Sequence, residues 1–330
     1  QRMALAEIEG DMAAPHRMLR LLQGDVGSGK TVVAFLAMLN AVEIGAQAAL
    51  MAPTEILARQ HFETISKFAE FSGVKAALLT GRDKGKVRTR LLELLARGDI
   101  DILVGTHALF SEDVTFKDLA FVVVDEQHRF GVHQRMALSA KGAQPDILAM
   151  TATPIPRTLL LAIYGDLDSS RLDEKPPGRQ SVDTRVLPID KLGEVSDGLA
   201  RAIEGGAQAY WVCPLVEESE TGDLAAVTER HKQLQQRFGD KVGLIHGRMK
   251  AAEKDAAMAR FSAGETSLLV STTVIEVGVD VPNATVMVIE HAERFGLSQL
   301  HQLRGRIGRG SGKSTCLLLY QGPLGETARA

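Results

Sequence analysis

The sequence predicts an α/β fold with two successive domains, each a mostly parallel sheet flanked by helices. Short apolar runs alternate with longer amphipathic stretches along the whole chain, which is the pattern of βαβ units. The 330 residues suffice for about two domains of ~150 residues each. Near residues 174–179 two prolines and a glycine interrupt the alternation. We therefore expect domain 1 over residues 1–175, a linker over 176–180 and domain 2 over 181–330.

The apolar runs predict buried strands, and the amphipathic stretches between them predict helices. In domain 1 we expect strands at 18–22, 48–53, 75–79, 101–105, 121–125 and 147–151, and helices at 32–42, 54–71 and 84–97. Thr54, directly after Pro53, is a favourable N-cap for the second of these helices. In domain 2 we expect strands at 182–187, 209–213, 242–245, 268–271, 285–289 and 316–320, and helices at 192–204, 225–238, 250–262 and 297–306.

The composition is that of an ordinary globular chain, with 45% hydrophobic and 24% charged residues. A net charge of −3 gives no overall basic field, so binding of nucleic acid would have to be local. No apolar run is long enough to span a membrane and no signal segment opens the chain. Cys213 and Cys316 lie far apart, which argues against a disulfide framework or a zinc site and favours a cytoplasmic location. Because the chain opens on Gln1, we expect it to be part of a longer protein.

Residues 24–31 read Gly-Asp-Val-Gly-Ser-Gly-Lys-Thr and satisfy G-x-x-x-x-G-K-[ST], the loop that wraps the phosphates of a nucleotide. A predicted strand precedes the loop and a predicted helix follows it, as the motif requires. Lys30 would reach the outer phosphates, and the Thr31 hydroxyl would bind magnesium. Backbone N–H groups of the loop would face the phosphates. The loop positions that we assign to the nucleotide are Gly24, Gly27, Ser28, Gly29, Lys30 and Thr31.

A second motif that would supply the metal-binding and catalytic acids is expected at residues 125–128. Four apolar residues are followed there by Asp-Glu-Gln-His. Because α/β sheets bind ligands at the carboxyl ends of their strands, these acids would face the phosphate loop. Asp125 would hold the metal, directly or through water, and Glu126 would orient or deprotonate the attacking water. Taken alone, the run is read more readily as a solvated strand end, and it is the phosphate loop earlier in the chain that favours the catalytic interpretation.

An ordered series of motifs then resembles the two-domain motor of superfamily 2 helicases. Beyond the two motifs above, the series comprises residues 53–58, 105–107, 151–154, 246–249, 272–280 and 302–309. The stretches 125–131, 153–158, 210–219 and 299–306 are similar, more specifically, to the RecG family of branch-migrating DNA helicases. The translocase module of the transcription-repair coupling factor shares much of this and stays an alternative.

This resemblance implies two tandem RecA-like domains with ATP and Mg²⁺ bound in a cleft between them. It implies a monomeric, cytoplasmic protein that hydrolyses ATP to move on branched or duplex DNA in recombination, repair and stalled-fork processing. In the RecG family the motor is only part of the chain, so we expect a wedge domain and a translocation hairpin outside its two ends.

The resemblance also implies residue roles. Arg306 and Arg309, three apart, would share one helix face and stabilise charge on the transferred phosphoryl group. An exposed basic helix face is the plainer alternative for this pair. Gln1 lies at the distance before the loop at which the family keeps a glutamine that reads adenine. The other positions implied to line the nucleotide are Gly278, Asp280 and Gln302.

Hydroxyl and basic side chains at strand ends are expected to grip DNA phosphates without reading bases. The candidates are Thr54, Arg59, Thr106, His107, His246 and Arg248. A basic stretch over residues 82–90 would either touch duplex DNA or be a solvated helix start. Coupling between nucleotide and DNA is implied for His128, Thr151 and Thr153.

Two other classes of protein stay open at this point. A DNA clamp that binds ATP without hydrolysing it would not need the catalytic residues Glu126, Arg306 and Arg309. Their presence therefore argues against a clamp. An RNA-directed helicase is not excluded, because contacts to the backbone alone do not separate DNA from RNA.

Overall fold

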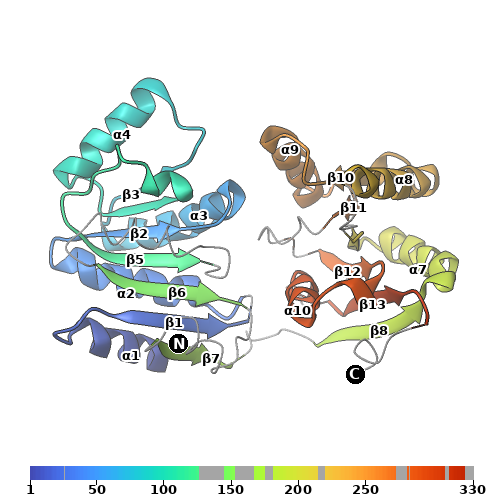
Figure 1. Cartoon of the computed structure of the whole chain (residues 1–330), viewed down its shortest axis with the longest axis horizontal. Helices are drawn as coiled ribbons and strands as arrows, with labels where there is room; N and C mark the ends of the chain where they lie inside the picture. Colours follow the sequence, from blue (N-terminus) through green and yellow to red (C-terminus); the bar gives the residue numbers. More distant parts are fainter. Residues whose placement is uncertain are drawn as a thin grey trace. The chain divides into compact units, whose positions relative to one another are not determined.

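The computed structural model describes residues 1–25, 27–125, 145–152, 167–174, 181–214, 220–272, 281, 283–308 and 312–323. The chain divides into two compact units, unit 1 over Gln1–Pro176 and unit 2 over Pro177–Ala330 (Figure 1). Each unit is a parallel β-sheet with helices on its faces, so the predicted fold class is confirmed. The linker expected at 176–180 lies outside the described residues.

Unit 1 contains a seven-stranded sheet in the order β3-β4-β2-β5-β6-β1-β7, and every neighbouring pair is parallel. Its strands are β1 Leu19–Gly24, β2 Gln47–Met51, β3 Ala76–Leu79, β4 Ile102–Gly105, β5 Leu119–Asp125, β6 Asp146–Thr151 and β7 Asp168–Leu172. Its helices are α1 Arg2–Met12, α2 Lys30–Glu43, α3 Glu55–Ser72 and α4 Gly85–Arg97, with a short 3₁₀ turn at His107–Phe110. The strands predicted from apolar runs are all present, with ends shifted by one or two residues.

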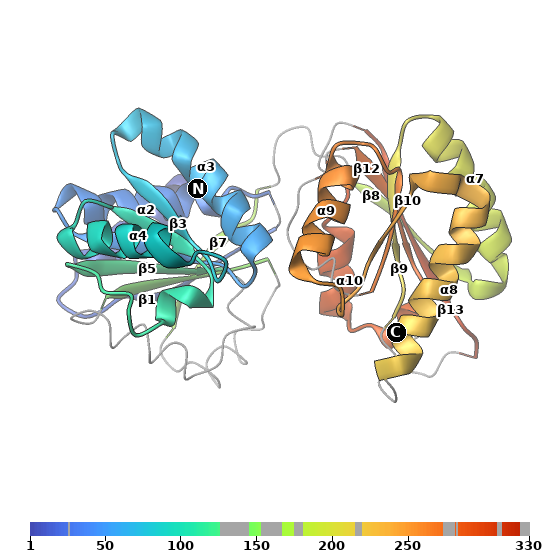
Figure 2. The same ribbon diagram turned by 90° about the horizontal axis from the view of Figure 1, so that it is seen from above.

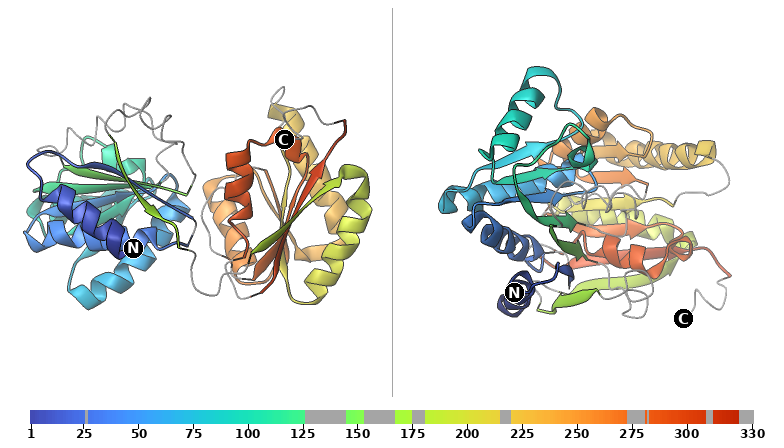
Figure 3. Two further views of the ribbon diagram at one scale, coloured as in Figure 1. Left: turned by 90° about the horizontal axis from the view of Figure 1, so that it is seen from below. Right: turned by 60° about the vertical axis from the view of Figure 1, so that its left-hand side comes forward.

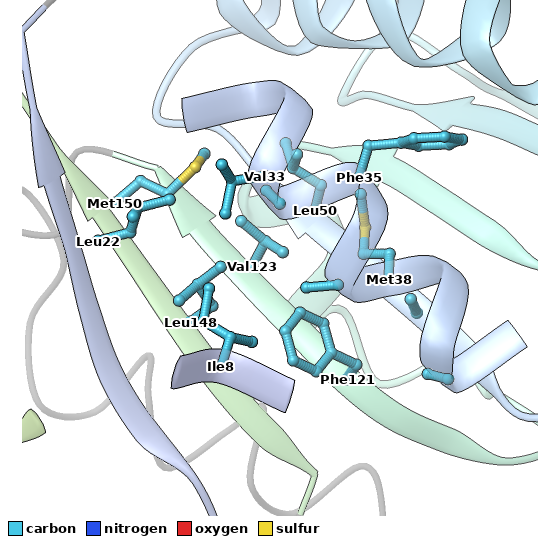
Figure 4. Close-up of a cluster of buried hydrophobic side chains, with 14 of the residues drawn as sticks. Ile8, Leu22, Val33, Phe35, Met38, Leu50, Phe121, Val123, Leu148 and Met150 are labelled. Atoms are coloured by element: carbon cyan, nitrogen blue, oxygen red, sulfur yellow. The ribbon is translucent and has the colours of Figure 1, made fainter. Parts of the chain in front are cut away.

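The core of unit 1 follows from the alternation of side chains along its buried strands. Leu50, Val123 and Leu148 lie in register on neighbouring strands and point to one face of the sheet. Figure 4 shows them packed with Phe35 and Met38 of α2. The intervening residues of the same strands point to the other face, which α4 and the 3₁₀ turn cover. A sheet covered on both faces leaves its strand ends as the places where polar groups meet ligands.

Two elements at one edge of this sheet were not predicted, α1 and β7. Among the described strands β7 pairs with β1 alone. Of its five residues Ser170 and Leu172 are buried, and its sequence has no apolar run that would predict a strand. A polar network replaces hydrophobic burial here: Arg20 donates to Asp11 at 2.6 Å and to the Ser170 hydroxyl at 2.9 Å, and that hydroxyl donates to Glu7. α1 accordingly lies along this edge (Figure 3).

Unit 2 contains a six-stranded parallel sheet in the order β10-β11-β9-β12-β13-β8. Its strands are β8 Val182–Pro188, β9 Gln208–Val212, β10 Val242–Ile245, β11 Leu268–Ser271, β12 Ala284–Ile289 and β13 Ser314–Tyr320. Its helices are α7 Leu192–Glu204, α8 Glu220–Phe238, α9 Ala251–Ser262 and α10 Leu297–Arg304. In Figure 2, α9 and α10 cover one face of this sheet and α7 and α8 the other, in agreement with the two apolar clusters.

A partly buried ion pair joins α8 to the sheet of unit 2. Glu290, 5% exposed at the end of β12, accepts a hydrogen bond from the indole of Trp211. Arg230 of α8 donates to the same carboxylate at 2.5 Å and 3.1 Å. Because a buried carboxylate is costly unless it is paired and hydrogen-bonded, this arrangement ties α8 to β9 and β12.

Both units have a buried glutamine at the start of the third strand in the sheet order, β2 in unit 1 and β9 in unit 2. In unit 1 the Gln47 amide donates to the carbonyls of Leu95 and Ile100, and its oxygen accepts from the N–H groups of Lys117 and Asp118. In unit 2 the amide of Gln208 donates to two carbonyls at the matching place, those of Phe261 and Thr266. We call these contacts the glutamine clasps. They fix the incoming loops at the sheet edge opposite the strands' carboxyl ends.

Candidate nucleotide and metal site

The sheet of unit 1 brings three predicted site segments to one edge. β5, β6 and β1 are neighbours and run parallel, so their carboxyl ends lie side by side. β1 leads into the phosphate loop, β5 ends at Asp125, and β6 ends at Thr151. Asp125 is 7% exposed and Thr151 is fully buried. The carboxyl-end rule that placed Asp125 beside the phosphate loop therefore holds, and Thr151, assigned through the family resemblance, lies at the same edge.

The phosphate loop has the backbone that its glycines permit. Gly29 is the N-cap of α2 and adopts φ +93°, a left-handed conformation that favours glycine. Gly24 is restricted by packing instead, because a Cβ there would lie 2.8 Å from the Leu172 side chain of β7. The Ser28 hydroxyl is buried beneath the loop. α2 thus begins at a loop that is shaped for backbone N–H groups to face an anion.

Two polar side chains hold this loop. The Lys30 ammonium donates to the carbonyl oxygens of Gly24 at 2.6 Å and Asp25 at 2.9 Å. The Gln1 side-chain amide donates to the Ser28 carbonyl at 2.8 Å. Gln1 was expected to recognise adenine, and the structure places its amide directly on the phosphate loop. Gln1 and Lys30 therefore contact the same loop, and recognition of adenine by Gln1 stays a prediction.

His61 of α3 joins the two expected metal ligands and was not predicted from the sequence. Its Nε2 lies 2.7 Å from Asp125 Oδ2, and its Nδ1 lies 3.5 Å from Thr31 Oγ1. The sequence pattern does mark this position: the buried residues of α3 are Leu57, Ala58, Ile65 and Ala69, and residue 61 falls on the same face at helical spacing. A histidine in that apolar stripe is a polar group that needs partners.

The donor set fits magnesium, which the family resemblance implies. Mg²⁺ prefers hard oxygen ligands and, in nucleotide sites, uses one or two protein groups together with phosphates. A hydroxyl at Thr31 and a carboxylate at Asp125 supply such oxygens, and both contact the same imidazole ring. Within the described residues no cluster of three or more histidine, cysteine or acidic side chains is present that could hold a metal without a nucleotide.

The candidate DNA contacts of unit 1 follow β2 and β4, at the same edge of the sheet. The Thr54 hydroxyl caps α3 by accepting from the N–H of Leu57 at 3.4 Å, and Arg59 is exposed one turn later. Thr106 is only 1% exposed, whereas His107 is exposed. Of this last pair, His107 is the one whose side chain is accessible to a phosphate.

The basic stretch at 82–90 is partly neutralised by acidic neighbours. Arg82 pairs with Glu55 at 2.6 Å, and Arg88 makes a bidentate contact with Asp113. These ion pairs favour the solvated helix start over a duplex-binding patch for the two arginines.

In unit 2, His246 and Arg248 follow β10, and Arg248 is exposed. Burial, followed by the charges of Lys254 and Arg248, lowers the pKa of His246 below its usual value. Such a histidine is neutral at pH 7 and offers a hydrogen bond to a phosphate without a charge. Its Nδ1 is buried and has no hydrogen-bond partner among the residues that the structure describes.

One local prediction for unit 2 is wrong. Arg306 was expected on the helix at 297–306, but α10 ends at Arg304 and Arg306 lies in the turn that follows, 9% exposed. Gly305 and Gly308 flank that turn, and glycines favour an early helix end. Gln302 lies on α10, half-buried. Six predicted residues lie outside the described ones: Glu126, His128, Thr153, Gly278, Asp280 and Arg309.

Comparison with known families finds a matching family model for each of the two units. A model of DEAD/DEAH box helicases matches residues 1–161, and a model of the helicase conserved C-terminal domain matches residues 191–311. Among solved structures, Saccharomyces cerevisiae Dbp5 bound to RNA and ADP BeF3 aligns with a TM-score of 0.71 at 17% identity, over 96% of this chain and 83% of that one. At this identity the match shows the fold alone.

More similar relatives cover the whole chain. It is 54% identical to the ATP-dependent DNA helicase RecG of Escherichia coli K12 and 52% identical to that of Bacillus subtilis 168. Each alignment covers 100% of this chain and 48% of the relative. A structure of RecG bound to a three-way DNA junction aligns with a TM-score of 0.82 at 45% identity, over 99% of this chain and 43% of that one. The chain thus spans about half the length of the curated relatives that it matches.

The two parallel-sheet units, the phosphate loop and the two family models together give this chain the domain pair found in DEAD/DEAH box helicases. Within that class the relatives that match over the whole chain are RecG helicases, which agrees with the motif resemblance. The relatives above favour RecG over the transcription-repair coupling factor. In the part of the chain that the structure describes, no helix is both long enough and apolar enough to cross a membrane.

Proposed function

We propose that this chain is the ATP-driven motor of a DNA helicase that moves on branched or duplex DNA during recombination, repair and stalled-fork processing. One observation carries the proposal: the phosphate loop after β1 and Asp125 at the end of β5 share one sheet edge and are connected through His61. Identity above 50% with RecG helicases over the whole chain supports DNA as the partner. We further propose a cytoplasmic monomer, with domain 1 and domain 2 meeting at a linker at 176–180.

Hydrolysis in this proposal is an in-line attack of water on the γ-phosphate. Lys30 leaves its carbonyl partners in the loop and neutralises charge on the outer phosphates. Glu126 orients the water and accepts its proton. Arg306 and Arg309 stabilise charge that develops on the transferred group. Magnesium, held by Thr31 and Asp125, would supply a Lewis acid for the phosphate oxygens.

The remaining assignments concern recognition and coupling. Besides the loop, the nucleotide is proposed to be contacted by Gln1, Gly278, Asp280 and Gln302. DNA phosphates are proposed to bind at Thr54, Arg59, His107, His246 and Arg248, without reading of bases. The Thr106 side chain is too buried to be assigned to this surface. The coupling of the two ligands is assigned to His128, Thr151 and Thr153.

The first experiment measures steady-state ATP hydrolysis by the 330-residue chain with and without a synthetic forked DNA at low salt. Glu126→Gln removes the proposed general base, and Glu70→Gln at an exposed position of α3 is the matched control. We expect turnover that forked DNA stimulates, lost in Glu126→Gln and retained in Glu70→Gln. Competition between duplex DNA and RNA of the same length identifies the nucleic acid that stimulates turnover.

The outcomes separate the alternatives. Nucleotide binding without turnover would identify an ATP-dependent clamp. Stimulation by RNA in preference to DNA would identify an RNA-directed helicase. Absence of nucleotide binding in the unaltered chain would overturn the assignment of the phosphate loop.

A further inference from the structure

Three elements of unit 1 converge on the ring of His61. Thr31 stands at the start of α2, Asp125 at the end of β5, and His61 in the second turn of α3. The imidazole contacts both oxygens, at 3.5 Å and 2.7 Å. The His61 side chain is 12% exposed and that of Asp125 is 9% exposed, so the bridge is largely sheltered from water.

The chemistry of the partners fixes the direction of these contacts. An ionised carboxylate can only accept, so Nε2 of His61 carries the hydrogen and donates it to Asp125. In a neutral ring Nδ1 then has a lone pair and accepts the hydroxyl proton of Thr31. A Thr31 hydroxyl whose proton is directed at His61 keeps its oxygen lone pairs for a cation. The ring thus restricts the rotation of one candidate ligand and the orientation of the other.

The geometry points to His61 as a positioning residue that holds the Thr31 hydroxyl and the Asp125 carboxylate in the arrangement that binds magnesium. This inference rests on the proposed function, because it concerns the metal that accompanies the nucleotide. In metal sites, groups that orient the ligands without touching the ion typically change metal affinity by about 10- to 100-fold when they are removed.

The fold of α3 does not require this histidine. Leu57, Ala58, Ile65 and Ala69 supply the buried face of the helix, and Thr54 caps its first turn. An apolar residue at position 61 would serve packing without the cost of burying a polar ring. We therefore explain the imidazole at position 61 by its contacts with the Thr31 hydroxyl and the Asp125 carboxylate.

The test measures metal affinity rather than turnover. The dissociation constant of a fluorescent, non-hydrolysable ATP analogue is determined in Mg²⁺ and in EDTA for the unaltered chain, His61→Ala and His61→Gln. Mn²⁺ binding is followed by electron paramagnetic resonance in the presence of the same analogue. The control is His231→Ala, since His231 is a half-buried helical histidine of unit 2 with one contact, 3.4 Å from the Val242 carbonyl.

We expect His61→Ala to lower Mn²⁺ affinity, and the gain in nucleotide affinity that Mg²⁺ gives, by about 10- to 100-fold, with binding in EDTA unchanged. His61→Gln should recover much of the loss, because its amide can also donate to Asp125 and accept from Thr31. An undiminished Mg²⁺ gain in His61→Ala overturns the inference and leaves the proposed function standing. An equal loss of nucleotide binding in Mg²⁺ and in EDTA would assign His61 a structural role and would overturn the inference as well. If the unaltered chain binds no nucleotide, the proposed function and the inference both fail.

Discussion

Gly29 of the phosphate loop allows the nucleotide site to be tested against a closely matched glycine. Gly29 and Gly45 both adopt left-handed backbone, at φ +93° and +82°. A Cβ at Gly29 would lie 2.1 Å from the side-chain nitrogen of Gln1, whereas a Cβ at Gly45 would meet no atom within 4 Å. Gly29→Ala and Gly45→Ala therefore impose the same kind of backbone strain, but only the first displaces a neighbour.

The expected magnitudes follow from these contacts. Left-handed backbone costs an alanine about 1–2 kcal/mol, which both variants should lose from the free energy of unfolding. Displacement of Gln1 breaks its hydrogen bond to the Ser28 carbonyl, worth about 1 kcal/mol more in Gly29→Ala. In a unit of this size the additional loss corresponds to a Tm about 2–4 °C lower than that of Gly45→Ala. If the altered loop loses one N–H contact to a charged phosphate, nucleotide affinity falls by about 1.5–3 kcal/mol, or roughly 10- to 150-fold.

Scanning calorimetry and titration with a non-hydrolysable ATP analogue measure both quantities. In a Gln1→Ala background, Gly29→Ala and Gly45→Ala should lower the Tm equally, because the contact that Gly29→Ala displaces is then already absent. Equal Tm values for the two glycine variants with Gln1 present would refute the reasoning about the loop. Weakened nucleotide binding in Gly45→Ala to the same extent would refute the assignment of the site.

Three further predictions test other parts of the structure. Gln47→Met breaks the four hydrogen bonds of its clasp and should cost unit 1 about 2–4 kcal/mol by calorimetry, whereas exposed Gln235→Met should stay within about 0.5 kcal/mol. Because the pKa of His246 is lowered, its ring is neutral at pH 7. As the pH falls below about 6.5, the unfolded chain takes up a proton at this ring before the folded chain does, so the free energy of unfolding decreases. His246→Gln should then leave the salt dependence of DNA binding unchanged at pH 7.5, whereas Arg248→Gln should reduce its slope by about 1, and equal slopes would contradict the assignment. Burial raises the pKa of Cys316 to about 12, so its thiol should resist a thiol reagent at pH 8 until denaturant is added, and rapid labelling of the folded chain would contradict this burial.

The sequence was most informative where burial is complete. β2, β5 and β6 are covered on both faces, so each is a continuous apolar run that predicts a strand directly. β7 could not be predicted, because an edge strand held by Arg20 and Ser170 needs no such run. The early end of α10 was missed because its apolar and basic residues continue past Arg304 although the helix does not.

The candidate site was predictable to the extent that it is made of local motifs. The phosphate loop and Asp125 are recognisable from contiguous residues, and parallel strands bring them to one edge. His61 belongs to neither motif, and its role depends on partners 30 and 64 positions away. Only the packing of α3 on the sheet reveals that contact, so periodicity could at most have marked the histidine as a polar residue on a buried face.

Trp211, the single tryptophan of the chain, gives the molecule a built-in optical reporter. The indole is fully buried in unit 2 and hydrogen-bonded to Glu290, and its surroundings change when β9 leaves the sheet. Its emission therefore follows the unfolding of unit 2, whereas unit 1 contains no tryptophan and unfolds without an indole signal. Comparison of the emission with circular dichroism, which reports the helices of both units, separates two unfolding transitions without any label.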